Sequence, residues 1–287
     1  MKFFSEQENW YKGNLHTHTT VSDGKYTPEQ TMDLYKQNGY DFLALTDHWK
    51  LSREDCWKGM LMLPGIELDA NVGHQGFHIV GVGMNGELKA ERGMIPQQLI
   101  DAINNAGGKA ILAHPAWSLL YPQDMAALKG LAGSEVMNSV SRTPFNGDRA
   151  DSAVLLDITA TLGSLLPFMA ADDSHFYKGE QCTNFIWVNA PELTAESILK
   201  AVGEKRFFAS QGPRFKQIEI EDNLMRVWCT PCERAVFYSQ ALWRNERVQK
   251  KSGAEYYEYV IGENERFIRC EIIDGQGRKA WSSPIAL

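Results

Sequence analysis

Short apolar runs alternate with amphipathic, helix-period stretches from residue 13 to about residue 212. The apolar runs predict strands at 13–18, 41–46, 77–82, 109–113, 135–138, 165–171 and 185–188. The stretches between them predict helices at 28–39, 96–106, 124–131, 150–162 and 194–203. The first helix carries its own start signal, with Thr27 as N-cap, Pro28 in the first turn and Gln30 completing a capping box.

Repeated strand–helix units predict an α/β fold in which helices cover a parallel sheet. Polar side chains collect at the C-terminal ends of the predicted strands, which is the active-site face of a closed β/α barrel. In such a barrel, residues as distant in sequence as His16 and His175 can meet at one centre. We therefore expect a barrel domain over residues 1–212.

The pattern changes after Gly212 and Pro213. Residues 216–221 alternate polar and apolar side chains with period two, and 256–261 and 267–273 do so less strictly. Asp274-Gly275 is a hairpin turn signal. We expect a small all-β, sandwich-like domain over residues 213–287.

The composition is that of an ordinary soluble protein, with 44% hydrophobic and 23% charged residues. Apolar runs are too short for a membrane span or a signal peptide, so we predict a cytoplasmic protein without a membrane partner. The odd number of scattered cysteines, five, argues against a disulfide framework, and Cys229 and Cys232 are interpreted as reduced thiols. The net charge of -7 disfavours extended nucleic acid but permits a nucleotide.

Histidine is used sparingly, and six of the seven histidines lie near acids at predicted strand ends or in the loops that follow. The candidate metal ligands are His16, His18, Asp23, His48, Glu67, His78, His114, Asp173 and His175. Imidazole and carboxylate are the ligands of hydrolytic metal sites. Nine side chains are too many for one tetrahedral zinc and suit two or three metals. Any one of them alone is explained by a hydrogen bond or a cap, but the set is not.

Some neighbouring residues compete for these roles. His74 could replace His78, although His78 is preferred because it opens a strand. Asp69 could replace Glu67. Two further acids either hydrogen-bond a ligand or are solvated: Asp47 and Asp172.

The ordered motifs resemble those of the PHP (polymerase and histidinol phosphatase) superfamily over about residues 13–212. They are Leu15-His16-Thr17-His18 with Asp23-Gly24, Thr46-Asp47-His48, Gly65-Ile66-Glu67, Ala113-His114-Pro115 and Asp173-Ser174-His175. Residues 210–213 and 269–284 are also similar to CehA/McbA-like metallohydrolases, in which a small β domain follows the barrel. Thr19 stands where the superfamily commonly has serine.

The resemblance implies a distorted (β/α)7 barrel with three divalent metals, which zinc, manganese or iron could supply. His16, His18, Glu67 and Asp173 would hold the first metal. Glu67, His78 and His114 would hold the second, with Glu67 bridging. Asp23, His48 and His175 would hold the third.

The function expected from such a centre is phosphoester hydrolysis, in which a metal-bridging hydroxide is the nucleophile. We single out Glu67, Asp173 and His175 as catalytic side chains. The substrate would be a small phosphomonoester or phosphodiester, with nucleotides among the candidates. Arg142, Arg149 and Lys50 are candidate phosphate contacts, although surface positions are the preferred interpretation of the two arginines. Trp117 and Phe77 could stack on a base or an aromatic leaving group, although packing is their preferred interpretation.

Two alternatives remain open from the sequence. One is a metallohydrolase of carbamate or carboxyl esters, in which the same centre would activate water. The other is a non-catalytic, metal-stabilised binding module. The sequence does not determine the oligomeric state.

Overall fold

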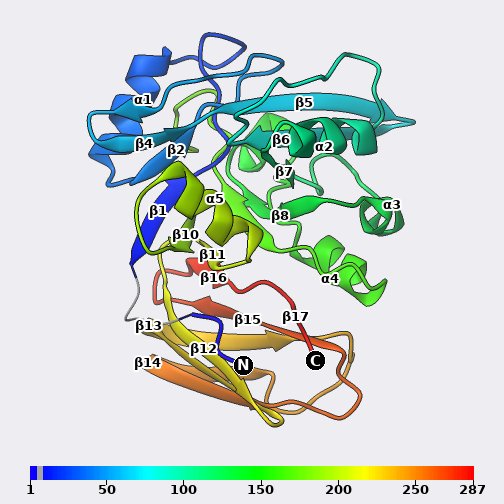
Figure 1. Ribbon diagram of the computed structural model, residues 1–287. Helices are drawn as coiled ribbons and strands as arrows, with labels where there is room; N and C mark the ends of the chain where they lie inside the picture. The colour runs from blue at the N-terminus through cyan, green and yellow to red at the C-terminus, as the bar shows by residue number, and fades with distance from the viewer. Residues whose placement is uncertain (5–8) are drawn as a thin grey trace.

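A computed structural model describes residues 1–4 and 9–287. Its α-helices are α1 Pro28–Gln37, α2 Pro96–Asn105, α3 Pro122–Ala127, α4 Ala153–Thr161 and α5 Ala195–Gly203 (Figure 1). The strands up to residue 210 are β1 Trp10–Asn14, β2 Phe42–Ala44, β3 Cys56–Trp57, β4 Met60–Leu63, β5 Gly65–Val72, β6 Gln75–Val82, β7 Lys109–Leu112, β8 Leu131–Asn138, β9 Phe168–Ala171, β10 Phe185–Asn189 and β11 Phe207–Ser210. The later strands are β12 Phe215–Glu221, β13 Leu224–Tyr238, β14 Val248–Val260, β15 Phe267–Ile273, β16 Lys279–Trp281 and β17 Ile285–Ala286.

All five predicted helices are present, and their ends follow local chemistry. At the start of α1, Thr27 Oγ1 accepts from the Gln30 backbone N–H at 3.3 Å, and Gln30 Oε1 accepts from the Thr27 N–H at 2.9 Å. The helix stops before Gly39, whose φ of 72° suits glycine. α3 ends earlier than expected because Leu128 is already extended. No helix in the described residues has the length and apolar content needed to cross a bilayer.

The described strands form two sheets rather than one parallel sheet. The larger has the order β12-β13-β15-β16-β11-β10-β1-β2-β4-β3, with β14 beside β13 and β17 beside β15. The smaller has the order β5-β6-β7-β8-β9. The expectation of parallel pairing is correct for β1–β2, β2–β4, β7–β8 and β8–β9. It is wrong for β5–β6 and β6–β7, and also for β10, which pairs with β1 and β11; all of these pairs are antiparallel. Only Gly73 and His74 separate β5 from β6, which is too short for a crossover helix.

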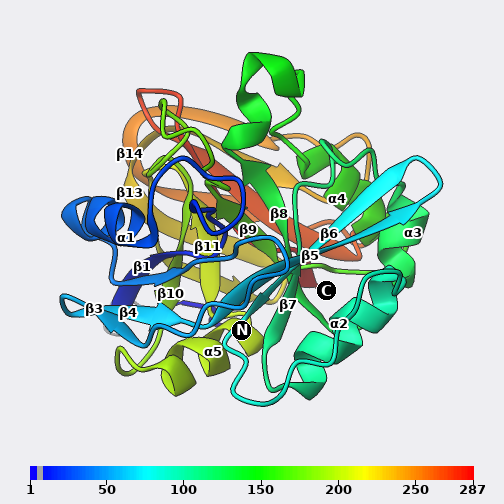
Figure 2. The ribbon, with the colours of Figure 1, turned by 90° about the horizontal axis from the view of Figure 1, so that it is seen from above.

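Continuous strand ladders do not close the two sheets into a (β/α)7 barrel. Two isolated parallel bridges nevertheless join them, Thr17 with Ser174 and His48 with Glu67. Thr17, His48 and Ser174 lie just beyond the ends of β1, β2 and β9, and Glu67 lies near the start of β5. Seen from above, the strands meet near the centre of this part of the chain, with α1, α2, α3 and α5 at its periphery (Figure 2). The bridges therefore bring the two sets of strand ends to one place.

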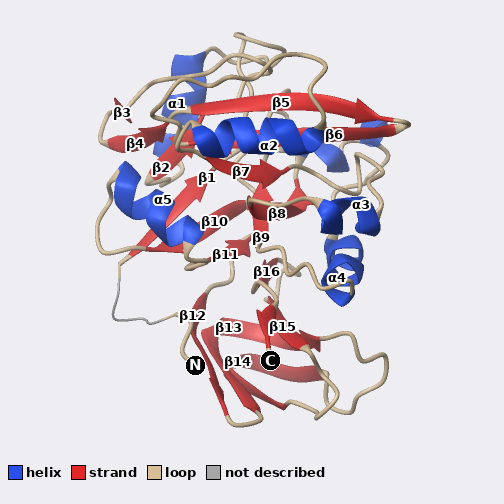
Figure 3. Cartoon of the chain, turned by 45° about the vertical axis from the view of Figure 1, so that its right-hand side comes forward, coloured by secondary structure: helices blue, strands red, loops and turns tan. Residues whose placement is uncertain are grey.

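After α5 the described chain forms strands and loops only (Figure 3). The first residues pair with β12, because the Phe3 N–H donates to the Ile218 carbonyl at 2.9 Å and Phe4 is buried in the same apolar cluster as β12 and β13. Arg269 on β15 is 1% exposed and binds Asp157 on α4 through two contacts of 2.6 Å. A buried ion pair thus links the C-terminal strands to the helical layer.

Candidate metal centre

The structure brings all nine predicted ligands together. His16 and His18 follow β1, Asp23 lies in the next turn, His48 follows β2, Glu67 and His78 lie on β5 and β6, His114 follows β7, and Asp173 and His175 follow β9. The alternatives do not join the cluster. His74 is exposed and its ring contacts Tyr121, while Asp69 accepts a hydrogen bond from the Trp49 indole. The preference for His78 and Glu67 therefore agrees with the geometry.

Glu67 is the hub of the cluster, and it is only 1% exposed. Its Oε1 lies 3.2 Å from His16 Nε2, 2.9 Å from His78 Nδ1 and 3.6 Å from His114 Nε2. Its Oε2 lies 3.1 Å from His18 Nε2 and 3.0 Å from His48 Nδ1. Both carboxylate oxygens thus face imidazole nitrogens, which is the geometry that a bridging carboxylate requires.

Asp173 is the second shared carboxylate. Its Oδ1 lies 3.1 Å from His16 Nε2, 3.2 Å from His18 Nε2 and 3.4 Å from His175 Nδ1. This oxygen is buried, and no group in the described residues makes a hydrogen bond to it. A buried, unsatisfied carboxylate oxygen is costly unless a cation compensates it. The donor set around Asp173 therefore fits a metal ion.

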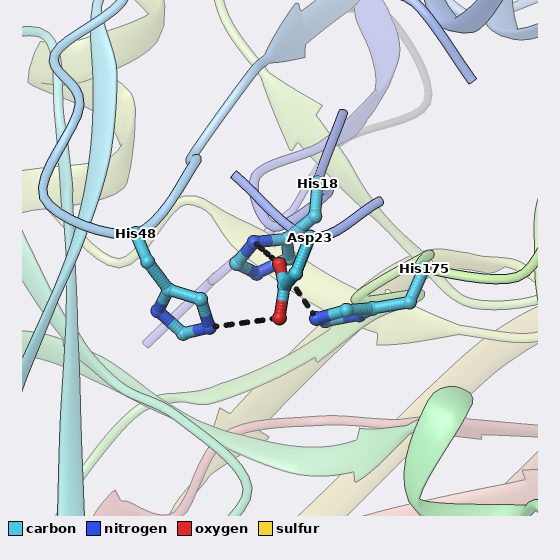
Figure 4. Close-up of side chains that lie close together, drawn as sticks. All are labelled: His18, Asp23, His48 and His175. Atoms are coloured by element: carbon cyan, nitrogen blue, oxygen red, sulfur yellow. Dashed lines mark ion pairs between the residues drawn. The ribbon is translucent and has the colours of Figure 1, made fainter. Parts of the chain in front are cut away.

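Asp23 organises the more open side of the cluster, where its carboxylate lies among three imidazoles (Figure 4). Its Oδ1 is 3.5 Å from both His18 Nδ1 and His175 Nε2, and its Oδ2 is 3.8 Å from His48 Nε2. The rings of His18 and His175 stack with their centroids 4.1 Å apart. His18 therefore contacts the Glu67–Asp173 side through Nε2 and the Asp23 side through Nδ1.

Four sets of side chains offer ligand atoms within 4.8 Å of one another. They are His18, Asp23, His48 and His175; His16, His18 and Glu67; His16, His114 and Asp173; and His48, Glu67 and His78. The first contains the whole triad that the PHP resemblance implies for a third metal. In the others, His48 accompanies Glu67 and His78, whereas His114 groups with His16 and Asp173. The sets therefore divide the nine residues differently from the three groups that the resemblance implied. Four residues each belong to two sets: His16, His18, His48 and Glu67.

The backbone at the cluster adopts conformations that side chains usually avoid. His114 has φ 28°, Asp173 has φ 52° and Trp49, next to His48, has φ 55°. Left-handed backbone in non-glycine residues costs on the order of 1–3 kcal/mol and is common at functional sites. Hydrogen bonds hold two of these residues in place: the Asp173 N–H donates to the His16 carbonyl, and the Trp49 N–H to the Glu67 carbonyl, each at 2.9 Å.

Glu135 on β8 is a site residue that the sequence analysis missed. It is 1% exposed, its Oε1 lies 2.7 Å from His16 Nδ1, and its Oε2 accepts from the His114 backbone N–H at 2.9 Å. Asn138 Nδ2 donates to Glu135 at 2.7 Å and to Asp173 Oδ2 at 3.1 Å. A carboxylate on the far nitrogen of a histidine directs the near nitrogen toward the metal. The sequence signal that could have identified Glu135 is the presence of an acidic residue in a predicted short strand.

We expect Glu135→Gln to weaken metal affinity by about 10–100-fold, since outer carboxylates orient histidine ligands. The amide keeps the size of the side chain but removes the charge that fixes the His16 ring. The measurement is chelator competition against the metal-loaded protein. Glu271→Gln is the matched control, because Glu271 is also buried but lies on β15. Equal affinities in the two variants would contradict this role.

The charged side chains in the cluster shift one another's pKa values. Burial acts to lower the pKa of His16, but the carboxylates of Asp173 and Glu67 outweigh it and hold that pKa well above its ordinary value. The same balance, with Asp173 and Asp23 opposing burial, raises the pKa of His175 to about 9. Burial would raise the pKa of Glu67, but the histidines, led by His16, hold it well below its usual range. Metal ions must therefore displace protons from this centre.

The metal-free protein should lose stability as the pH rises from 6.5 to 9. The pKa of His175 is raised from 6.5 to about 9 on folding, so its contribution is complete below pH 6.5 and is lost through pH 9. That contribution is on the order of a few kcal/mol, because a pKa change of one corresponds to about 1.4 kcal/mol. Asp23 and Asp173 have lowered pKa values, so their contributions are lost only in acid.

Urea unfolding of chelator-treated protein at pH 6 and pH 9 measures this effect. The metal-loaded protein is the comparison, because bound metal has already displaced the protons and should remove the decline. Greater stability of the stripped protein at pH 9 than at pH 6 would contradict the expected sign.

Asp47 and Asp172 support the site without contacting a ligand side chain. Asp47 is buried and accepts hydrogen bonds from the backbone and hydroxyl of both Thr19 and Ser22, which holds the turn that carries Asp23. Asp172 is fully buried and accepts from the backbone N–H groups of Cys182, Thr183 and Asn184 and from the Tyr35 hydroxyl. Burial raises the pKa of Asp172 to about 6. Neither acid is solvated.

A cavity of about 300 Å³ opens on the cluster. Seven of the nine candidate ligands line it, together with Trp117, Val140, Ser141, Phe145, Asn146 and Phe176. His16 and His18 are not among its lining residues and are buried. Arg142, Arg149 and Lys50 are exposed and do not line this cavity, so the structure does not bring the predicted phosphate contacts to the cluster. Phe77, a predicted stacking residue, is packed in the core, whereas Trp117 lines the cavity.

No family model matches the chain. The 5'-3' exoribonuclease Rnm of Salmonella typhimurium is 32% identical over 93 residues, which are 30% of this chain and 32% of that protein. A 3',5'-nucleoside bisphosphate phosphatase of Chromobacterium violaceum is 32% identical over 78 residues, which are 25% of this chain and 27% of that protein. The matched segments thus span no more than about a third of these curated relatives.

One solved structure is similar along nearly the whole chain. It is a two-domain protein from Bacteroides vulgatus that contains a predicted PHP-like metal-dependent phosphoesterase. The TM-score is 0.58 at 14% identity, and the match covers 99% of this chain and 96% of that one. This likeness confirms the resemblance to PHP proteins at the level of the fold.

Proposed function

We propose that this chain is a metal-dependent phosphoesterase that hydrolyses a small phosphate ester. The observation that carries the proposal is the meeting of nine imidazole and carboxylate side chains, centred on Glu67 and Asp173, beside a cavity of about 300 Å³. The fold shared with a PHP-like protein and the partial similarity to a nucleoside bisphosphate phosphatase support the same reaction class.

We further propose that the cluster holds three divalent cations, of zinc, manganese or iron. His16, His18, Glu67 and Asp173 would hold the first; Glu67, His78 and His114 the second; and Asp23, His48 and His175 the third. Short contacts from both Glu67 oxygens support its place between two cations. Cations bound here supply an activated water and neutralise charge on the phosphoryl group.

The chain's own residues divide into two layers around the cavity. Glu67, Asp173 and His175 line it and are the proposed catalytic side chains. His16 and His18 are buried behind them and hold both carboxylates through contacts of 3.1–3.2 Å. The ester therefore approaches from the Asp23 and His175 side, and the buried histidines keep the carboxylates fixed while the reaction proceeds.

A second candidate function is hydrolysis of an uncharged carbamate or carboxyl ester. The observation that favours it is the cavity lining, which contains no lysine or arginine in the described part of the chain. Phosphate binding usually recruits such cations, so a lining without them also accepts a neutral ester. In the phosphoesterase proposal, the metal ions alone supply the positive charge.

Turnover of p-nitrophenyl phosphate and bis-p-nitrophenyl phosphate, after reconstitution with manganese, zinc or ferrous iron, tests the proposal. We expect hydrolysis of at least one compound, and the preferred one distinguishes a monoesterase from a diesterase. Hydrolysis of p-nitrophenyl acetate alone would instead favour the ester hydrolase. No turnover of any compound, with bound metal verified by elemental analysis, would contradict both enzyme functions and leave a metal-stabilised binding module.

Two structural proposals accompany the function. We propose that β1, β2 and β5–β9, joined by the bridges at Thr17 and His48, act as a distorted seven-stranded barrel. We also propose a domain boundary near residue 212, with residues 1–4 belonging to the C-terminal strands that they pair with. This arrangement leaves the metal cluster entirely within the first domain.

A further inference from the structure

Three aromatic side chains line the cavity beside the metal ligands: Trp117, Phe145 and Phe176. They come from separate segments, the loop after β7, the 3-10 helix Pro144–Asn146, and the loop after β9. Phe176 directly follows His175, and Trp117 lies three residues after His114. The chain thus presents an aromatic residue next to ligands on two different strand ends.

Trp117 is held at a defined position. Its indole N–H donates to Asn146 Oδ1 at 2.9 Å, which ties it to the same 3-10 helix that carries Phe145. Its ring meets His114 edge-on at 4.9 Å and His78 at 5.7 Å between centroids. The polar atom of this tryptophan is satisfied, and its half-buried ring contributes apolar surface to the cavity lining.

Phe145 and Phe176 line the same cavity. Their rings meet edge to face with centroids 5.0 Å apart, although Phe145 is 69% exposed. A phenylalanine exposed to this extent contributes little to folding, so packing does not account for it. Its position at the cavity mouth, against a second aromatic ring, is the arrangement of a stacking surface.

Charge around the cavity indicates which part of an ester these rings would meet. The cavity lining holds acids and histidines but, in the described residues, no lysine or arginine. Arg142 and Lys178 line a neighbouring cavity that shares only Phe145 and Phe176 with the first. The two rings therefore separate the metal cluster from the nearby basic side chains. A second phosphate attached to the substrate would find no lysine or arginine among the described residues that line the metal side.

We propose that Trp117, Phe145 and Phe176 form a binding subsite for an uncharged, planar aromatic group, carried on the ester oxygen of the phosphate that the metal cluster engages. This inference rests on the proposed function and narrows its substrate class. The substrate is an aromatic phosphate ester with one phosphate, rather than a nucleoside bisphosphate. The phosphoryl group faces Glu67 and Asp173, and the ring faces the aromatic wall.

Hydrolysis of benzyl phosphate and cyclohexylmethyl phosphate by the manganese-loaded protein tests the subsite. Both carry one phosphate on a primary alkyl oxygen and differ in whether the six-membered ring is planar and aromatic. We expect kcat/KM to favour benzyl phosphate by about tenfold, the low end of base–aromatic stacking contributions. In Phe145→Leu/Phe176→Leu the ratio should approach one. Trp243→Leu is the control, because Trp243 is 87% exposed and lies in the β13–β14 connection.

Calorimetry with non-hydrolysable probes gives a readout that does not depend on turnover. Phenylphosphonate should bind the metal-loaded protein about tenfold more tightly than methylphosphonate. The double phenylalanine variant should lose that difference and retain its metal content. A variant that loses metal would be replaced in the same assay by Phe145→Leu alone, since Phe145 is exposed and precedes no ligand.

The outcomes separate this inference from the proposed function. Equal kcat/KM for the two ring phosphates, with unchanged ratios in the variants, would overturn the subsite and leave the phosphoesterase standing. A preference for a nucleoside 3',5'-bisphosphate over benzyl phosphate would also overturn the subsite if Arg142→Gln removed that preference. The second phosphate would then reach Arg142 across the rings of Phe145 and Phe176. Absence of all turnover would reject the phosphoesterase, and the phosphonate affinities would still decide the subsite.

Discussion

Asp173→Asn is expected to lower kcat/KM for phosphate ester hydrolysis by on the order of 10³-fold while the protein stays folded. Asp173 Oδ1 lies within 3.4 Å of three imidazole nitrogens and has no hydrogen-bond partner in the described residues. Asparagine keeps the shape of the side chain but removes the negative charge. The neighbouring histidines then repel a cation without the compensating carboxylate, so metal binding and hydrolysis are lost together.

Steady-state kinetics, metal analysis and circular dichroism on the same sample measure this effect. Asp101→Asn is the matched control, because Asp101 is an exposed acid on α2 outside the cluster. Unchanged kcat/KM in Asp173→Asn with full metal content would show that Asp173 is not part of the catalytic centre. If both the activity and the circular dichroism signal are lost, the Asp173→Asn variant has failed to fold. Asp173→Glu, which keeps the charge, would then be measured in its place.

Glu67→Gln is expected to remove at least one metal ion per chain and to destabilise the metal-free protein by about 3–5 kcal/mol. Both oxygens of Glu67 face histidine nitrogens, five in all, at distances of 2.9–3.6 Å. An amide offers one oxygen and one N–H₂ group, which cannot bridge two cations. In the metal-free state, the loss of the carboxylate leaves protonated histidines buried without their main counter-charge.

Elemental analysis after dialysis against metal gives the number of bound ions per chain, and urea unfolding after chelation gives the stability. Glu265→Gln is the control, because Glu265 is also buried but lies in the connection between β14 and β15, outside the cluster. Full metal content in Glu67→Gln would rule out the bridging role. A stability loss no larger than that of the control would rule out Glu67 as the main counter-charge of the cluster.

Much of the site could be predicted because its ligands come from short local patterns. His16 and His18 lie two residues apart just after β1, and Asp173 and His175 have the same spacing just after β9. Each pattern needs only a strand, its end and the loop that follows. The helix starts are equally local, as the capping box of Thr27 and Gln30 illustrates. Such features depend on neighbours within a few residues.

Other features depended on contacts that no local pattern contains. Glu135 contacts His16 from 119 positions away, and only the register of β8 turns it toward the cluster. The antiparallel pairing of β5 with β6 follows from the link of only two residues between these strands. The predicted strand–helix repeat did not take this short link into account. Arg142 lies on the far side of Phe145 and Phe176, so loop position alone misassigned it to the metal side.

The sequence by itself determined which side chains are available at strand ends, because periodicity, capping and ligand chemistry act over a few residues. It therefore predicted the helices and the nine imidazole and carboxylate side chains, the candidate metal ligands, that the fold brings together. Only the tertiary structure decided how two separate sheets meet through isolated bridges, how Glu135 contacts the cluster, and which aromatic rings border the cavity. These outcomes depend on strand register and loop packing, which join residues as far apart in the sequence as Thr17 and Ser174 and are set by the folded chain as a whole.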